Sequence, residues 1–134
     1  MAVSKFLDPK NDIAFKKIFG SEKNKDILIH FINDIMGFKD GDLIKDVSFL
    51  SPVQDPEIAY KKQSAVDVLC EAENGTKIIV EMQVAPFKGF EKRAQYYAAK
   101  AYSRQLAQGQ GEDGLYANLK EVIFIAISEY KIFP

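Results

Sequence analysis

The sequence predicts an α/β domain with a mixed central sheet. Three observations lead to this prediction: two helical patterns near the N-terminus, a hairpin pattern around Asn74-Gly75, and a helical segment between that hairpin and an apolar strand at residues 122–127. A hairpin is antiparallel, whereas a helix between two strands indicates a parallel, right-handed crossover. The predicted order is therefore helix, strand, hairpin, helix, strand.

The first elements are two amphipathic helices followed by a strand. In residues 11–19 the apolar side chains recur every three or four positions, and Asp12 at the start complements the helix dipole. Residues 24–36 form the second helix, which Gly37 is expected to end. Its expected buried stripe consists of Ile27, Leu28, Phe31, Ile32 and Ile35. Residues 43–50 are the predicted strand.

The composition is that of one ordinary folded domain. The chain has 134 residues, of which 47% are hydrophobic, and a net charge of −1, so any basic surface must be local. A single cysteine, Cys70, favours a reducing compartment and is expected to be a buried strand residue. No apolar run is long enough to span a membrane, and no apolar signal core is present, so we expect a cytoplasmic protein. We expect a single domain over 1–134, truncated at its C-terminus, because the chain stops soon after the last strand.

The loop length at Asn74-Gly75 decides which faces the hairpin side chains occupy. A two-residue loop mixes charged and apolar residues on both faces. A three-residue loop over 73–75, with Gly75 in the left-handed conformation, collects the polar residues on one face. That register places Asp67 opposite Glu81 and Glu71 opposite Lys77, and it is the one we predict.

Two carboxylates opposed across a sheet have β-carbons about 5 Å apart and repel each other. A divalent cation between Asp67 and Glu81 would turn this repulsion into a binding site, and hard oxygen ligands suit Mg²⁺ or Mn²⁺. The alternative is a solvated face on which both acids are merely tolerated.

Residues 89–107 form a predicted helix with a basic stripe. Its members follow the i, i+4, i+7, i+11 spacing, and we expect them to contact DNA phosphates. They are Arg93, Tyr97, Lys100 and Arg104. A solvated helix face is the alternative. The opposite side is expected to pack on the sheet through Ala94, Ala98, Tyr102 and Leu106. The strand at 122–127 is nearly all apolar, which is typical of burial on both faces.

These motifs resemble a known nuclease signature. Asp67, followed after thirteen residues by Glu81-Met82-Gln83, resembles the PD-(D/E)XK motif in its E-x-Q variant. Together with the N-terminal Asp8-Pro9 and Phe15-Lys16, the chain resembles the recombination-promoting nucleases and transposases of that superfamily. The resemblance implies a restriction-endonuclease-like αβββαβ core.

The resemblance also implies a metal-dependent DNA endonuclease using Mg²⁺ or Mn²⁺. Asp67, Glu81 and the carbonyl of Met82 would be metal ligands, and Asp12 an assisting acid. Gln83 would stand where most relatives have a catalytic lysine. An amide supplies no positive charge, so catalysis would rely on other cations, Arg93 or Lys100.

Two other function classes stay open. One is a catalytically impaired DNA-binding module with the same fold, which the glutamine at position 83 favours. The other is an oligomerisation or protein-interaction domain, including a homodimer, with Tyr96, Phe87 and Phe90 as candidate exposed aromatics.

Overall fold

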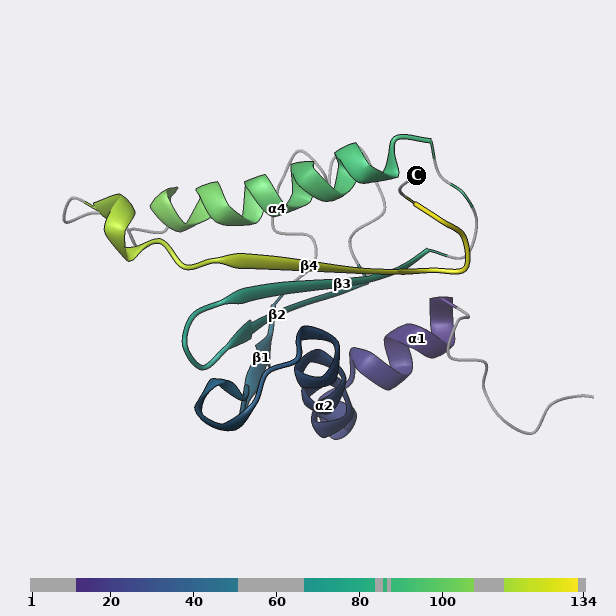
Figure 1. The fold of residues 1–134 in the computed structure, drawn as a ribbon, viewed down its shortest axis with the longest axis horizontal. Coiled ribbons are helices and arrows are strands. Elements are labelled where there is room, and N and C mark those ends of the chain that lie inside the picture. The colour runs from purple at the N-terminus through teal and green to yellow at the C-terminus, as the bar shows by residue number, and fades with distance from the viewer. Residues whose placement is uncertain (1–11, 51–66, 84–85, 87, 108–114, 133–134) are drawn as a thin grey trace, which may run out of the picture.

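A four-stranded mixed sheet with helices on both faces forms the core of the molecule (Figure 1). The computed structural model describes residues 12–50, 67–83, 86, 88–107 and 115–132. Within these ranges the α-helices are α1 (Asp12–Phe19), α2 (Lys25–Met36) and α4 (Phe90–Ala107). The strands are β1 (Val47–Phe49), β2 (Val68–Ala72), β3 (Lys77–Gln83) and β4 (Val122–Ser128). The predicted α/β class is confirmed.

The strands lie in the order β1-β2-β3-β4. The pairs β1–β2 and β2–β3 are antiparallel, whereas β3 and β4 are parallel (Figure 1). Helix α4 is the crossover between β3 and β4. Val68 pairs with Val80 and Glu71 with Lys77, as the three-residue loop predicts. Gly75 has a φ of +93°, a conformation in which glycine is favoured.

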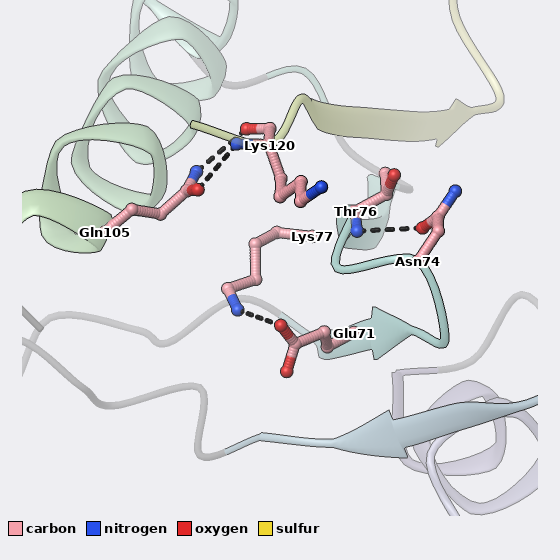
Figure 2. A network of polar contacts seen from close by, with 6 residues as sticks. All are labelled: Glu71, Asn74, Thr76, Lys77, Gln105 and Lys120. Atoms are coloured by element: carbon pink, nitrogen blue, oxygen red, sulfur yellow. Dashed lines mark hydrogen bonds and ion pairs between the residues drawn. The ribbon is translucent and has the colours of Figure 1, made fainter. Parts of the chain in front are cut away.

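The hairpin tip is held by its own polar side chains. The carboxylate oxygen Oε1 of Glu71 accepts a hydrogen bond from Lys77 Nζ at 2.6 Å, and Asn74 Oδ1 accepts one from the backbone N–H of Thr76 at 3.0 Å (Figure 2). These short-range contacts fix the register at the turn, and the rest of the ribbon follows from it.

Two hydrophobic clusters lie on opposite faces of the sheet. Below it in Figure 1, α1 and α2 contribute Phe15, Leu28 and Ile32 to a core with the even-numbered residues of β2 and β3. Above it, Tyr97 of α4 packs on Leu69 and Ile79. The polar face predicted for the hairpin is therefore the face beneath α4.

The N-terminal half differs from the prediction in two places. Strand β1 is shorter than the predicted 43–50, because the side chain of Asn33 holds the backbone of Ile44 through two hydrogen bonds of 3.0 and 2.9 Å. The predicted buried stripe of α2 is wrong for Ile27 and Ile35, which are 43% and 56% exposed. The helix ends at Gly37 in the left-handed conformation, as predicted.

The C-terminal half differs from the prediction in which strand and which helix residues are buried. Among the described strands β4 is at the edge, with Ala126 exposed, and β3 is the strand buried on both faces. The predicted packing face of α4 is wrong for Tyr102 and Leu106, which are exposed. Phe90, expected to be exposed, is buried, whereas Tyr96 is exposed; Phe87 lies outside the described residues.

The end of α4 is tied to the start of β4 by one buried amide. Gln105 Nε2 donates to the carbonyl oxygen of Lys120 at 2.8 Å, and its Oε1 accepts from the N–H of Lys120 at 2.7 Å (Figure 2). Because Gln105 is fully buried, these bonds satisfy polar groups that water cannot reach. This is why a glutamine lies on the packing face of the helix.

Candidate active site

Asp67 and Glu81 lie at the end of the hairpin away from its turn. The register that pairs Val68 with Val80 brings Asp67, one residue earlier, beside Glu81, one residue later. Side chains alternate between faces along a strand, so Glu81 lies on the face of Ile79, beneath α4. Asp67 directly precedes β2 and borders both layers, because its carboxylate reaches the backbone of Met82 and Lys16 of α1. The predicted opposition of these two residues across the ribbon is what this register produces.

Glu81 is a buried acid paired with a helix arginine. Its Oε1 lies 2.9 Å from Nη1 of Arg93, and the two side chains are 5% and 17% exposed. The Arg93 guanidinium also lies over the ring of Tyr97, 5.2 Å from its centroid. Because Tyr97 packs on the sheet one helical turn later, it fixes the part of α4 that presents Arg93 to the acid.

Asp67 is held by the neighbouring strand and by the opposite helical layer. Its Oδ2 accepts the backbone N–H of Met82 at 2.8 Å, and its Oδ1 lies 3.8 Å from Nζ of Lys16 on α1. The Asp67 side chain is 10% exposed and that of Lys16 is 54% exposed. The acid is therefore mostly covered, with a solvent-facing cation at its edge.

Met82 takes part in this site only through its backbone. Its side chain points to the opposite face, into the core with α1 and α2. In an antiparallel ladder the N–H and C=O of one residue point to the same neighbouring strand. Since the Met82 N–H meets Asp67, its carbonyl also lies on the side of β3 that faces β2. The third predicted ligand thus faces β2, the strand that Asp67 precedes.

The other predicted residues are distributed around this pair. Gln83 is at the end of β3, partly exposed, on the face of Glu81 and in register with Ser128 of β4. Asp12 is the first residue of α1, and its side chain is outside the described part of the chain. Lys100 Nζ lies 5.6 Å from the ring centroid of Tyr96, about 10 Å along the helix axis from Arg93.

Two other members of the predicted basic stripe differ in exposure. Arg104, one turn after Lys100, is partly buried, whereas Tyr97 is buried against the sheet. The structure therefore pairs Glu81 with Arg93, and Asp67 with the backbone of Met82. It sets Lys100 and Arg104 further along the helix, toward the hairpin turn.

The donor set fits a hard divalent cation. Within the described ranges no three acidic, histidine or cysteine side chains cluster as a metal site. Two carboxylates and a backbone carbonyl are nevertheless the kind of partial oxygen shell that Mg²⁺ completes with water and substrate phosphate. Arg93 and Lys16 place two positive charges beside the two acids, which balances the charge of the pair.

Lys16 is the residue that the sequence did not assign to the site. In the sequence it appears only as part of the Phe15-Lys16 motif of the family resemblance, to which no role in the site was attached. Nothing in the spacing of the helix shows that its last turn meets the start of β2, a contact between segments about fifty residues apart.

A mixed sheet whose antiparallel hairpin carries two adjacent acids, followed by a crossover helix and a parallel strand, defines a restriction-endonuclease-like α/β domain. The chain belongs to the PD-(D/E)XK nuclease family transposases, whose family model matches residues 9–134. This confirms the resemblance found in the sequence and indicates a nuclease or transposase type of function.

Neither the search of curated proteins nor that of solved structures gave a match. Nucleases of this kind typically use divalent metal ions. In the described part of the chain, no helix combines the length and apolarity that crossing a bilayer requires.

Proposed function

We propose that the protein is a DNA endonuclease dependent on Mg²⁺ or Mn²⁺. The observation that supports this best is the position of two acids at one end of the hairpin: Glu81 is paired with Arg93 of α4, and Asp67, just before β2, accepts the N–H of Met82 beside it. Two carboxylates in that position are costly in an ordinary sheet and useful for phosphodiester hydrolysis.

In this proposal Asp67, Glu81 and the Met82 carbonyl hold the cation. When bound, it lowers the pKa of a water and polarises the scissile phosphate. The Gln83 amide orients the attacking water or a phosphate oxygen through hydrogen bonds, with Asp12 as an assisting acid. The water oxygen bonds to phosphorus as one ester P–O bond breaks; the water's proton leaves to solvent, and the departing oxygen takes up a proton from solvent.

The helix α4 holds the DNA backbone. Arg93, Lys100 and Arg104 neutralise phosphates, so binding weakens as salt concentration rises. Because Tyr97 is buried, its part in this surface is to support the Arg93 guanidinium rather than to stack on a base. Arg93 contacts Glu81 and Lys100 lies over the ring of Tyr96, so both side chains reorient when they meet phosphate.

Plasmid nicking with Mg²⁺ or Mn²⁺ tests the proposal. Wild type should nick, and Asp67→Ala and Glu81→Gln should lose most of the activity. Glu121→Gln, an exposed acid just before β4, is the matched control and should behave as wild type. Equal nicking by all four proteins would refute the assignment of the two acids.

A second candidate is a DNA-binding module that retains the fold without the reaction. The neutral amide of Gln83 favours it, because the resemblance implies a lysine there in most relatives and an amide cannot stabilise a developing negative charge as strongly. It predicts salt-dependent DNA binding with no cleavage in either metal. Light scattering on the same preparation tests the third class, self-association through exposed aromatics such as Tyr96.

A further inference from the structure

The proposed reaction lacks a positive charge at the position of Gln83. Arg93 is mostly buried and engaged with Glu81, and Lys100 lies over Tyr96 further along α4. Lys16 is the remaining cation beside the acids in the described structure. We propose that Lys16 of α1 supplies the charge that contacts the scissile phosphate, an inference that rests on the proposed endonuclease function.

The position of Lys16 suits this role. Its Nζ lies 3.8 Å from Asp67 Oδ1, and its side chain is 54% exposed while that of Asp67 is only 10% exposed. The ammonium is therefore on the solvent side of the carboxylate, where a DNA phosphate would approach. A lysine ammonium is a compact charge with three donors on a flexible stem, which fits a phosphate oxygen.

The backbone beneath Lys16 is fixed against the sheet. Phe15 is fully buried, and the ring of Phe19 lies 5.1 Å from that of Phe31 on α2, so α1 cannot rotate freely. At the end of the helix, the N–H of Gly20 donates to the carbonyl of Lys16 at 2.8 Å. A Cβ at Gly20 would lie 2.7 Å from that carbonyl oxygen and 3.7 Å from Val68 Cγ2. The last turn of α1 thus packs tightly at the start of β2, and only the lysine side chain is left to move.

A purely structural role explains the placement less well. An ion pair at 3.8 Å with one exposed partner contributes little to stability. Asp67 is already held by the Met82 N–H. The attraction between a lysine ammonium and the phosphate, in contrast, becomes stronger as negative charge develops on the phosphoryl oxygens. It therefore stabilises the transition state more than the ground state, which accelerates the reaction.

The experiment compares Lys16→Met with Lys16→Arg and with Lys17→Met. Lys17 is the exposed neighbour on the same helix and serves as the matched control. Single-turnover cleavage of plasmid DNA and Mn²⁺ affinity by calorimetry without DNA are measured for each, with thermal unfolding as the folding check.

For Lys16→Met we expect cleavage to fall about 100-fold. Mn²⁺ affinity should rise roughly threefold, because removing a cation beside Asp67 relieves repulsion of the metal. Lys16→Arg should recover part of the cleavage, and Lys17→Met should match wild type in both measurements.

The outcomes separate the two proposals. An active wild type with unchanged cleavage in Lys16→Met overturns the role of Lys16 and leaves the endonuclease function intact. Lost cleavage together with a lowered unfolding temperature assigns Lys16 a structural role and also overturns it. An inactive wild type refutes the endonuclease and, with it, the role of Lys16 at a scissile phosphate.

Discussion

Arg93 on α4 and Glu81 on β3 form an ion pair with 2.9 Å between nitrogen and oxygen, and both side chains are largely removed from solvent. The other acid, Asp67, has its cation on the opposite helical layer, at Lys16 of α1. The candidate site therefore joins all three layers of the fold. A shift of either helix relative to the sheet would change the surroundings of one acid.

Replacing Arg93 with Met should lower the free energy of unfolding by about 3 kcal/mol, because Glu81 stays buried after losing its ion partner. Urea denaturation measures this. Arg104→Met, on the same helix, is the control and should cost less than about 1 kcal/mol. In a double-mutant cycle with Glu81→Gln, additive losses would contradict a direct coupling between the two side chains.

Glu73 gives stability that depends on pH. Its carboxylate accepts the backbone N–H groups of Lys45 at 2.9 Å and Asp46 at 3.1 Å, and these bonds, that of Lys45 first, hold the pKa of Glu73 below its ordinary value of 4.5. A lowered folded-state pKa stabilises the protein above about pH 4.5, and this contribution is lost as the pH falls further.

Glu73→Ala should therefore destabilise the protein by about 1 kcal/mol at pH 7 and by clearly less at pH 3. Urea titrations at both pH values test this, with Glu121→Gln as the control. A difference from wild type that is the same at pH 7 and pH 3 would show that the carboxylate charge has no part in holding the start of β1.

The buried amide of Gln105 should tolerate no apolar replacement. Gln105→Leu removes both hydrogen bonds between this fully buried side chain and the N–H and C=O of Lys120, which should cost about 1–3 kcal/mol. Gln95→Leu, at an exposed position of the same helix, should change little. Equal denaturation midpoints for the two variants would contradict the anchoring of α4 to β4.

Cys70 should be unreactive in the folded protein. It is fully buried in β2, and burial raises the pKa of its thiol to about 12, so the nucleophilic thiolate is scarce at neutral pH. Labelling by a maleimide at pH 7 should be at least about 100-fold slower in buffer than in urea. Rapid labelling without denaturant would show that the sheet opens far more readily than its packing indicates.

The hairpin could be predicted from the sequence because only one register separates its polar and apolar residues. That pattern predicted the pairing of Glu71 with Lys77, which the structure confirms, and it predicted that Asp67 and Glu81 lie at the end of the hairpin away from the turn. The family resemblance depended on the same residues, so fold class and family followed together.

The remaining differences come from contacts between distant segments. Ile27 and Ile35 fit an apolar helical stripe, yet the sheet covers only the part of α2 around Leu28 and Ile32. The face of α4 could not be chosen by composition, because its buried positions include a tyrosine and a glutamine whose partners are on β2, β3 and before β4. Lys16 was missed for the same reason.

The glycine at the hairpin tip controls the alignment of acids at the far end of the ribbon. Gly75 has a φ of +93°, and a Cβ there would lie 3.0 Å from Cγ of Lys120, so a bulkier residue strains the three-residue turn. The competing two-residue turn slides one strand along the other and sets Asp67 against Met82, whose side chain belongs to the opposite layer. Sequence variation at this tip can therefore abolish the acid pair while leaving both acids in the sequence.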